Sequence, residues 1–518
     1  MLVKTFASAT HGVDAQMITI EVNAGGNVPA GKLGYYLVGL PDNAVKESYQ
    51  RIEAALKNVG SKYPRIKTTV NMAPADLRKE GAAYDLPIAV GMLAAVEAVK
   101  PDNLGDYIIL GELALDGELR PVKGVLPIAI QARTDGFKGI ILPEENAREA
   151  AIVNDLKVYG MKNLKDVIGF LNGTQEVKPT MVNTREEFFN QQDNYIEDFS
   201  DVKGQENIKR ALEIAAAGGH NVILIGPPGA GKTMLAKRLP TILPALSLKE
   251  ALETTKIHSV AGLLPTHSAL VTRRPFRSPH HTISDVALVG GGNNPRPGEI
   301  SLAHNGVLFL DELPEFRRDV LEVMRQPMED RHVTISRARF SIDYPASLML
   351  IASMNPCPCG YFNHPEKECV CAPGIVKKYL NKISGPLLDR IDIHVEVTPV
   401  SYDKLSDWHY QSESSTVIRA RVEKAREVQI DRFKSLSDIY NNAQMPGKMV
   451  KEVCVLNQAG QTLLKNAMKK QQLSARAYDR ILKVSRTIAD LEGSVDIKIE
   501  HLAEAIHFRS LDKESWLG

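Results

Sequence analysis

The stretch NVILIGPPGAGKT, residues 221–233, decides the fold of the largest part of this chain. Asn221–Ile225 is a short apolar run with the length of a buried strand, and the residues after Thr233, MLAKRLPTIL, open with helical character. The eight residues between them fit G-x-x-x-x-G-K-[ST] at every position, in the strand, loop and helix context that this pattern requires. Glycines let such a loop direct its backbone N–H groups at phosphate oxygens, and the helix N-terminus adds its positive end. The stretch therefore predicts a loop that binds nucleotide phosphates.

Most of the loop residues are expected to bind phosphate through their backbone, and two are expected to act through their side chains. We expect Lys232 to bridge the terminal phosphates of ATP and the Thr233 hydroxyl to ligate Mg²⁺. The expected ATP-binding residues are Gly226, Pro227, Pro228, Gly229, Ala230, Gly231, Lys232 and Thr233.

Two later apolar runs also end in polar residues. Residues 306–313 read GVLFLDEL, with Asp311 and Glu312 at the carboxyl end of a predicted strand, where open α/β sheets bind ligands. We expect Asp311 to hold Mg²⁺ and Glu312 to polarise the attacking water. Capping of a helix at Pro314 would explain one of these acids but not the pair. A third run, LMLIAS at 348–353, precedes Asn355, which is placed to hold the water or sense the γ-phosphate.

The 518 residues are more than one hydrophobic core usually serves, so several domains are expected. Residues 1–172 mix β-rich runs with amphipathic helical stretches. The β-rich runs are Met17–Val22, Lys67–Met72, Tyr107–Leu110 and Gly139–Leu142, and Asn43–Val59 is one of the helical stretches. Residues 173–200 are polar and read as a linker. Residues 201–400 alternate strands and helices as a parallel α/β sheet does, and residues 401–518 are predicted to be helical, with a cationic segment at 465–486.

Composition limits where in the cell the protein can be expected and which partners it can bind. The formal net charge is +1, so a nucleic-acid site must be a local patch. No apolar run at the N-terminus has the length of a signal peptide, and the longest one, Leu86–Val96, is too short to span a bilayer and predicts a buried helix. We therefore expect a cytoplasmic protein without a membrane partner, in which the cysteines stay reduced.

The order of these motifs resembles a known family. VKGQENIKRALEIAAAGGHNVILIGPPGAGKT, GVLFLDELPEF, ASMNPCPCG and SGPLLDRIDI are similar to segments of the magnesium-chelatase-like branch of AAA+ ATPases, and within it to the ComM/YifB family. The resemblance covers nearly the whole chain. It implies an α/β P-loop core with a C-terminal helical lid, and the activity regarded as typical of the family, a competence-associated hexameric DNA helicase that promotes branch migration.

The resemblance also implies roles for two arginines. Arg390, in LLDRID, matches the arginine finger that reaches the nucleotide of a neighbouring subunit, and Arg476, in LSARAYDRIL, matches the second sensor on the lid. A fixed guanidinium neutralises charge on the transferring phosphoryl group. A surface salt bridge is the alternative for each arginine. An active site completed by a neighbour requires an oligomer, so a homohexameric ring is expected.

Residues 331–346, RHVTISRARFSIDYPA, alternate like a β-hairpin. They resemble the hairpin that AAA+ helicases direct into the central channel. Arg337 and Arg339 are two residues apart, so on a strand they would share one face and follow DNA phosphates without reading bases. A solvated charged hairpin is the alternative. Arg273, Arg274 and Arg277 are further candidates for the channel.

Four of the five cysteines fall within fifteen residues, in the insert at 356–372. Cys357, Cys359, Cys369 and Cys371 can close a tetrahedral Zn²⁺ site, although the C-x-C spacing is tighter than is usual. His364 or His394 could replace one ligand, and buried thiols without metal are the alternative. We expect a structural zinc that fixes the loop directly after Asn355.

The N-terminal region resembles the proteolytic domain of Lon proteases, an α+β fold of the ribosomal S5 domain 2 type. The resemblance lies in KEGAAYDLPIAVGMLAA and in GELALDGELRPVKGVLPIAIQARTDGFKGIILPEEN. That peptidase needs a serine nucleophile and a lysine base. Here the serine position is Ala83 and the lysine position falls at about Leu126, so the resemblance implies the fold without the chemistry.

The sequence therefore favours a DNA-translocating ATPase that acts on single-stranded or branched DNA. Three alternatives remain open at this point. They are a magnesium-chelatase-type remodelling motor, a protein-remodelling chaperone or protease, and a nucleotide-gated assembly platform without enzymatic turnover.

Overall fold

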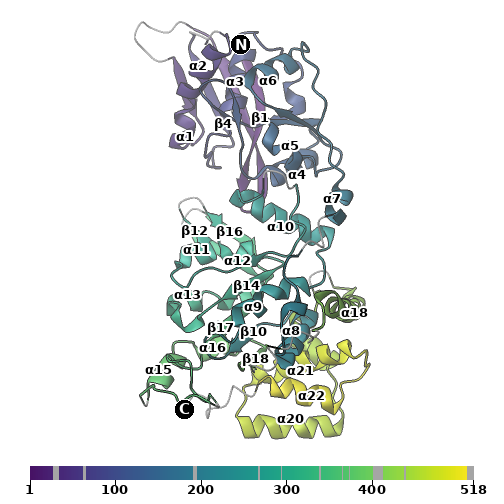
Figure 1. The fold of residues 1–518 in the computed structure, drawn as a ribbon. Helices are drawn as coiled ribbons and strands as arrows, with labels where there is room; N and C mark the ends of the chain where they lie inside the picture. The colour runs from purple at the N-terminus through teal and green to yellow at the C-terminus, as the bar shows by residue number, and fades with distance from the viewer. Residues whose placement is uncertain are drawn as a thin grey trace. The chain divides into compact units, whose positions relative to one another are not determined.

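The computed structural model describes residues 1–26, 34–61, 63, 66–190, 195–265, 269–292, 295–337, 340–364, 366–372, 374–400, 406, 412–436 and 439–509. The chain divides into two compact units (Figure 1). Unit 1 comprises residues 1–192 and 247–272, and unit 2 comprises residues 193–246 and 273–518.

Unit 1 is built on a seven-stranded mixed sheet with the strand order β3-β4-β2-β1-β5-β8-β9. Its first half is antiparallel, through the pairs β1–β2 and β2–β4, and the pairs β3–β4, β1–β5, β5–β8 and β8–β9 are parallel. The strands are β1 (Leu2–His11), β2 (Asp14–Ala24), β3 (Tyr35–Val38), β4 (Thr68–Ala73), β5 (Tyr107–Ile109), β8 (Gly139–Pro143) and β9 (Lys157–Met161). A small ladder joins β6 (Glu112–Leu113) to β7 (Leu119–Arg120).

The helices of unit 1 cover this sheet. Every residue of α3 (Asp85–Ala95) is buried, and α3 contacts β1 and β2, which confirms the buried helix predicted at 86–96. The helix predicted at 43–59 is divided at Glu47 into α1 (Asn43–Lys46) and α2 (Ser48–Asn58). The other elements are η1 (Leu104–Asp106), α4 (Val125–Thr134), α5 (Glu144–Ala150), α6 (Leu164–Leu171) and α7 (Thr184–Asn190).

Helix α10 (Leu248–Ala261) follows the phosphate-loop region in sequence but belongs to unit 1. It begins with a capping box between Ser247 and Glu250 and contacts α4. The backbone N–H of Gly124 donates to the Ser259 carbonyl (3.1 Å), and the Ser259 hydroxyl donates to the buried carboxylate of Glu149. The structure therefore differs from the expected continuous ATPase core at 201–400. The expected linker at 173–200 likewise includes α7 and η2 (Phe199–Asp201).

Unit 2 contains a five-stranded sheet with the order β11-β14-β17-β10-β18, in which every pair is parallel. The strands are β10 (Val222–Ile225), β11 (Phe276–Arg277), β14 (Val307–Leu310), β17 (Met349–Met354) and β18 (Ile393–Glu396). All residues of β10, β14 and β17 are buried, as expected for strands covered on both faces. The α/β class expected for this region is confirmed.

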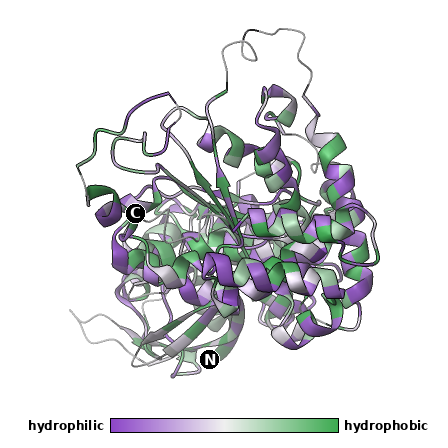
Figure 2. Cartoon of the chain, turned by 90° about the horizontal axis from the view of Figure 1, so that it is seen from below, coloured by the Kyte–Doolittle hydropathy of each residue, from purple (hydrophilic) through white to green (hydrophobic). Residues whose placement is uncertain are grey.

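A helical region after residue 412 packs on this sheet. It comprises α18 (Ser415–Phe433), η5 (Asn442–Gln444), α19 (Gly447–Val453), α20 (Gln458–Gln471), α21 (Ala475–Leu491) and α22 (Ile499–His507). Ile488, Leu502 and Phe433 share one hydrophobic cluster with Val222 and Phe309 of the sheet. In Figure 2 the helices carry both hydrophobic and hydrophilic residues. The lid and the sheet therefore form one unit.

Shorter elements complete unit 2. They are α8 (Glu206–Gly218), α9 (Lys232–Arg238), η3 (Leu239–Thr241), α11 (Asp285–Val289), α12 (Glu299–Leu302), η4 (Leu313–Glu315), α13 (Arg318–Glu322), α14 (Arg325–Asp330), α15 (Ile375–Leu380) and α16 (Gly385–Leu388). Two ladders pair β12 (Gly290–Gly291) with β13 (Arg296–Pro297), and β15 (His332–Arg337) with β16 (Phe340–Pro345). Among the described residues, no helix has the length and apolar character needed to cross a membrane.

Candidate nucleotide and metal sites

The phosphate loop joins the carboxyl end of β10 to the first turn of α9. Gly231 precedes α9 with a φ of 85°, in the left-handed region that glycine adopts without strain. A Cβ atom at Gly226 would lie 2.3 Å from the carbonyl oxygen of Val397. Glycine is therefore required at both ends of the loop, which agrees with the sequence pattern.

The Lys232 side chain folds back over this loop. Its Nζ donates to the carbonyl oxygens of Gly226 (2.7 Å) and Pro227 (2.9 Å) and to Oδ1 of Asn355 (3.0 Å). Burial lowers the pKa of Lys232, against the opposing effect of the Asp311 and Glu312 carboxylates. The ammonium group is thus held at the phosphate loop by neutral carbonyl and amide oxygens, which triphosphate oxygens can replace.

Asp311 is the centre of a hydrogen-bonded group at the end of β14. Its Oδ2 accepts from the Thr233 hydroxyl (2.7 Å), and its Oδ1 accepts from the Ser353 hydroxyl and from the backbone N–H of Glu312 (3.0 Å). A carboxylate and a hydroxyl at this distance are oxygen ligands of the kind that Mg²⁺ prefers. Asp311 and Thr233, predicted from separate motifs, are therefore brought together.

Glu312 follows Asp311 with a φ of 53°, an uncommon conformation for a residue other than glycine. Its side chain is 59% exposed, and its Oε2 lies 3.6 Å from Nδ1 of His281. Strained backbone geometry of this kind gathers at functional sites, where the surrounding structure enforces it. The carboxylate faces solvent at the phosphate loop, as the activation of a water molecule requires.

Arg390 lies at the amino ends of the parallel strands, whereas the phosphate loop lies at their carboxyl ends. Val222 pairs with Ile393 and Ile225 pairs with Glu396, so the phosphate loop follows the carboxyl ends of the strands while Arg390 precedes the amino end of β18. A strand of this length spans roughly 13 Å. Arg390 therefore lies too far away to contact a nucleotide bound at the loop of its own chain.

The Arg390 side chain is buried, with 5% of its surface exposed. Its guanidinium group forms an ion pair with Glu329 (2.6 Å) and donates to the Pro386 carbonyl (2.6 Å). The resemblance implied an arginine that extends toward a neighbouring subunit. In this structure the side chain is instead turned to its own chain, because the Glu329 carboxylate neutralises it there. Arg476, the expected second sensor, is exposed in the first turn of α21.

The hairpin predicted at 331–345 is present as β15–β16, in register from His332–Pro345 to Arg337–Phe340. The side chain of Arg337 and the whole of Arg339 lie outside the described residues, so their common face stays a prediction. The expectation that Arg277 lines a channel is not supported, because its guanidinium is paired with both oxygens of Glu299 (2.6 and 2.7 Å). Arg274 is similarly bonded to the carbonyl of Pro244 (2.6 Å), and Arg273 stacks on Tyr195.

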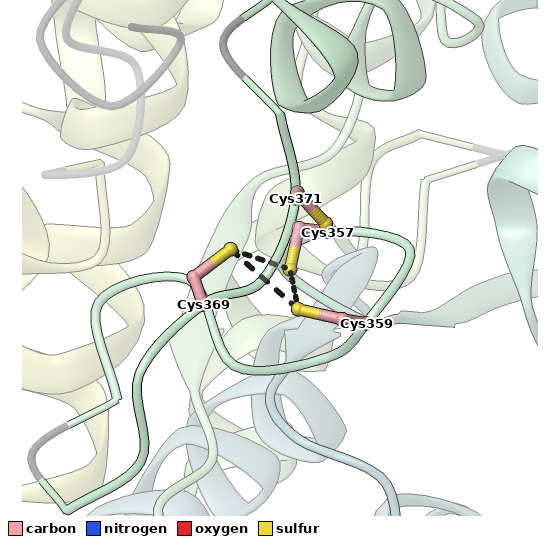
Figure 3. A group of neighbouring side chains, drawn as sticks. All are labelled: Cys357, Cys359, Cys369 and Cys371. Carbon is pink, nitrogen blue, oxygen red and sulfur yellow. Dashed lines mark hydrogen bonds between the residues drawn. The ribbon is translucent and has the colours of Figure 1, made fainter.

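The four cysteines of the insert come together (Figure 3). Their sulfur atoms all lie within 4.8 Å of one another, and Cys357 is buried. The closest pairs are Cys357–Cys359 (3.2 Å), Cys359–Cys369 (3.5 Å) and Cys357–Cys369 (3.7 Å). Four thiolates around a Zn²⁺ ion at about 2.3 Å require spacings of this order. The donor set and its geometry therefore fit zinc.

Two further observations support ligation at this cluster. The backbone N–H of Phe362 donates to Sγ of Cys357 (3.3 Å). The predicted alternative ligands lie elsewhere, since His394 is buried beside Arg509 (3.3 Å) and Nδ1 of His364 accepts from the backbone of Glu366 (3.1 Å).

The cysteine-bearing loop touches the phosphate loop. A Cβ atom at Gly360 would lie 2.5 Å from Cδ of Pro228. A hollow beside this contact is lined by residues of both loops and of the β18 end, among them Pro227, Phe362 and Val397. The insert and the phosphate loop therefore pack directly against each other.

In unit 1, the positions that would carry a serine–lysine peptidase hold other groups. Ala83 precedes α3, and Leu126 lies in the first turn of α4, where its N–H donates to Glu149 (2.9 Å). Nearby, the buried Asp85 accepts from Nε and Nη2 of Arg51 (2.6 and 2.9 Å). Burial raises the pKa of Asp85 to about 6 against the lowering effect of Arg51. Neither Ala83 nor Leu126 therefore supplies the serine or lysine side chain that the peptidase requires.

Sequence reasoning missed three residues at these sites. Ser353 bonds Asp311, His281 faces Glu312, and Glu329 neutralises Arg390. Ser353 could have been recognised from the sequence, because it is the lone hydroxyl in an otherwise apolar strand. Glu329 could not have been recognised from the sequence, because nothing in the local pattern distinguishes it from the other acids of residues 322–330.

A phosphate loop after β10, the Asp311–Glu312 pair after β14 and a helical lid on the same core define an ATPase of the AAA+ class. The comparisons with known families agree. The family described as magnesium chelatase, subunit ChlI, matches residues 198–405, the family described as subunit ChlI of Mg-chelatase matches residues 20–146, and the C-terminal domain family of the same subunit matches residues 412–509.

The chain belongs to the ComM/YifB family of magnesium-chelatase-like ATPases. It is 45% identical to competence protein ComM of Haemophilus influenzae over 507 residues, which are 98% of this chain and 97% of that protein. It is 44% identical to YifB of Escherichia coli over 508 residues, 98% of this chain and 96% of the relative. It is also 31% identical to Lon protease 2 of Bacillus subtilis over 153 residues, 28% of this chain and 27% of that protein.

Proposed function

We propose that this protein is an ATP-driven DNA motor that acts as a homohexameric ring and promotes branch migration during recombination or natural transformation. The observation that carries the proposal is the β15–β16 hairpin with Arg337 at its end, inserted in an ATPase whose phosphate site is otherwise complete. A related protein bears the name competence protein ComM, which supports a substrate taken up as DNA. ATP and DNA are both cytoplasmic substrates, which fits the expected location.

The ring follows from the position of Arg390. Arg390 precedes the amino end of β18, one strand length away from the phosphate loop of its own chain. An arginine finger in this position therefore acts on the nucleotide of a neighbouring subunit. Lys232, Glu312 and Asn355 act within one chain: Lys232 on the phosphates, Glu312 on the attacking water and Asn355 beside the γ-phosphate. Arg476 on the lid completes the set. Thr233 and Asp311 would hold Mg²⁺, which would supply positive charge to neutralise the phosphates.

The hairpin supplies the DNA contact in this proposal. Arg337 and Arg339 bind phosphates of single-stranded or branched DNA without reading its sequence. Each cycle of hydrolysis moves the hairpin relative to the strand.

The cysteine cluster is proposed to bind one structural Zn²⁺ through Cys357, Cys359, Cys369 and Cys371. The geometric fit of the four sulfur atoms supports this assignment. Unit 1 is proposed to be a Lon-protease-like domain without peptidase activity, because Ala83 and Leu126 replace the required dyad. It serves as a scaffold or as a second DNA-contacting ring.

The test is the ATPase rate of the purified protein with and without single-stranded and four-way branched DNA. We expect DNA to raise the rate and the Glu312→Gln variant to have almost no activity under any condition. Changing Arg337 and Arg339 to alanine should weaken DNA binding and remove the stimulation while the basal rate stays unchanged. An active hexamer that neither responds to DNA nor promotes branch migration would rule the motor proposal out.

A second candidate is a magnesium-chelatase-type remodelling ATPase, which the matching family descriptions favour. The same assay separates the two candidates. A remodelling ATPase would show a basal rate that is indifferent to DNA and to the two arginine substitutions. A protein-remodelling chaperone would be stimulated by an unfolded protein substrate instead.

A further inference from the structure

The candidate finger is held in place by one acidic side chain. The Arg390 guanidinium donates to Glu329 and to the Pro386 carbonyl, and its Nε has no hydrogen-bond partner among the described residues. The carbonyl of Pro386 lies four residues away in the same segment, so this contact is local. Glu329 is therefore the only contact in this set that ties the charge of Arg390 to a distant part of the chain.

The backbone around Arg390 is fixed separately. On one side, the Ser474 hydroxyl donates to Asp389 (3.5 Å), and on the other, Arg480 donates to Asp392 (2.7 Å). Ser474 caps α21 and Arg480 lies in it, so the segment 389–392 is attached to the lid helix that carries Arg476. Because the backbone is anchored without Glu329, the Arg390 side chain can change partner by rotation while its segment stays in place.

Glu329 is placed to release the arginine. Its side chain is 45% exposed, whereas that of Arg390 is 5% exposed, so the pair opens to solvent on the glutamate side. A half-exposed ion pair contributes little free energy. A guanidinium group binds phosphate oxygens with two parallel hydrogen bonds, so a triphosphate competes well with a single carboxylate contact.

We propose that Glu329 is the resting partner of Arg390 and that the nucleotide of a neighbouring subunit takes its place when the ring forms. The inference rests on the finger role given to Arg390 in the proposed function. Glu329 is a positioning residue here, because it acts through Arg390 and touches no substrate. This exchange raises the protein concentration needed for ring assembly, because one Glu329–Arg390 ion pair must be broken at each subunit interface.

Glu329 also lies at the foot of the hairpin. It belongs to α14, which ends one residue before Arg331, and Arg331 donates to the Gln444 carbonyl (3.0 Å) and accepts at its own carbonyl from Ala346 (2.8 Å). Release of Glu329 therefore removes one of the contacts that fix the start of β15. In this way the partner exchange carries the state of a neighbouring nucleotide to the hairpin.

The test measures ring assembly in saturating Mg²⁺-ATP, in a Glu312→Gln background that retains ATP. The protein concentration at half-assembly, determined by mass photometry, should fall roughly 2–5-fold when Glu329→Gln removes the competing charge. Glu322→Gln is the matched control, because it removes the charge of a nearby acid whose partners are Ser384 and Arg325 (2.7 Å) rather than Arg390. Arg390→Ala should raise the half-assembly concentration and abolish the effect of Glu329→Gln.

The outcomes distinguish the two levels of the proposal. If Arg390→Ala weakens assembly but Glu329→Gln behaves like the Glu322→Gln control, the finger role stands and the inference about Glu329 is wrong. If Glu329→Gln has the same effect with and without Arg390, the inference is wrong as well, because the effect does not pass through the arginine. If Arg390→Ala changes neither assembly nor the ATPase rate of the active protein, the finger role fails and the inference fails with it.

Discussion

At the scale of single residues, the hydrogen bonds to Asp311 determine how a metal would be held. Its carboxylate accepts from Thr233, Ser353 and the N–H of Glu312, so both oxygens have fixed directions before any ligand binds. A metal-binding carboxylate oriented in this way binds without first losing side-chain freedom. Ser353 is the member of this group with no other role at the site, which makes it a clean test.

Ser353→Ala should reduce the affinity for Mg²⁺ or the ATPase rate by about 10–100-fold, the range typical for loss of a residue that orients a ligand. The measurement is the Mg²⁺ dependence of ATP hydrolysis. Ser485→Ala is the control, because Ser485 is also buried and donates within its own helix to Ile481 (2.7 Å). Equal Mg²⁺ dependence in the two variants would show that Ser353 does not orient Asp311.

Asp392 is a buried acid whose charge is paired within the fold. It is buried, and burial raises its pKa, but Arg480 and hydrogen bonds from His220 and the Asn221 backbone outweigh burial and hold the pKa well below its usual range. Asp392→Asn leaves Arg480 without its charge partner. The free energy of unfolding at pH 7 should fall by about 3 kcal/mol, as for other buried ion pairs that lose one member.

The pH dependence of this loss has a definite sign. A carboxyl whose pKa is depressed in the folded state stabilises the fold fully above its unfolded pKa of about 3.9 and loses that contribution as the pH falls further. The difference between the wild type and Asp392→Asn should therefore be constant from pH 7 to about pH 5 and shrink below about pH 4. Urea unfolding at several pH values measures it, and a difference that grows on acidification would contradict the assignment.

At the scale of elements, the phosphate loop and the polar residues that follow β14 and β17 could be predicted from sequence. Each is a continuous run in which a buried strand is followed at once by polar residues, so the signal is local. The partner of Arg390 could not be predicted in this way. Glu329 lies 61 residues earlier in the sequence, and only the fold brings it within 2.6 Å. Ser259 and Glu149, 110 residues apart, are a second case.

The cysteine-bearing loop gives the element-scale prediction. The purified protein should contain about one equivalent of zinc per chain, and Cys369→Ser combined with Cys371→Ser should remove it. Because Gly360 packs on Pro228, loss of the metal should also raise the KM for ATP. Metal analysis and ATPase kinetics measure the two effects, with Cys454→Ser as a control outside the cluster. Less than about half an equivalent of zinc in the unmodified protein would contradict the site.

At the scale of the whole molecule, the two units are joined by three crossings of the chain, near residues 192, 246 and 272. The sequence predicted the order of domains but not this exchange, because α10 has the composition of an ordinary ATPase helix. Which unit α10 joins depends on its packing against α4, and no local sequence pattern predicts that contact. Contacts within unit 1 hold α10 through Ser259 and through the ion pair of Lys256 with Asp14 (3.2 Å).

A cut in the chain should therefore fail to separate the units. With a protease site introduced at residues 176–178, the N-terminal fragment should stay bound after cleavage, because α10 remains packed in unit 1 while covalently joined to unit 2. Size-exclusion chromatography of the cleaved protein measures this. Adding Ile257→Asp, which places a charge at a fully buried position of α10, should release the fragment. Release without this substitution would show that α10 does not anchor unit 1.

The same exchange affects how the protein is made. As the chain emerges from the ribosome, residues 1–192 appear first, yet unit 1 is incomplete until residue 272 has been added, 80 residues later. At usual synthesis rates this interval is about 4–16 s. During that time the surface on α4 that α10 covers is exposed, and the phosphate loop is synthesised within the same interval. The N-terminal unit therefore completes its fold only after the start of the ATPase has been translated.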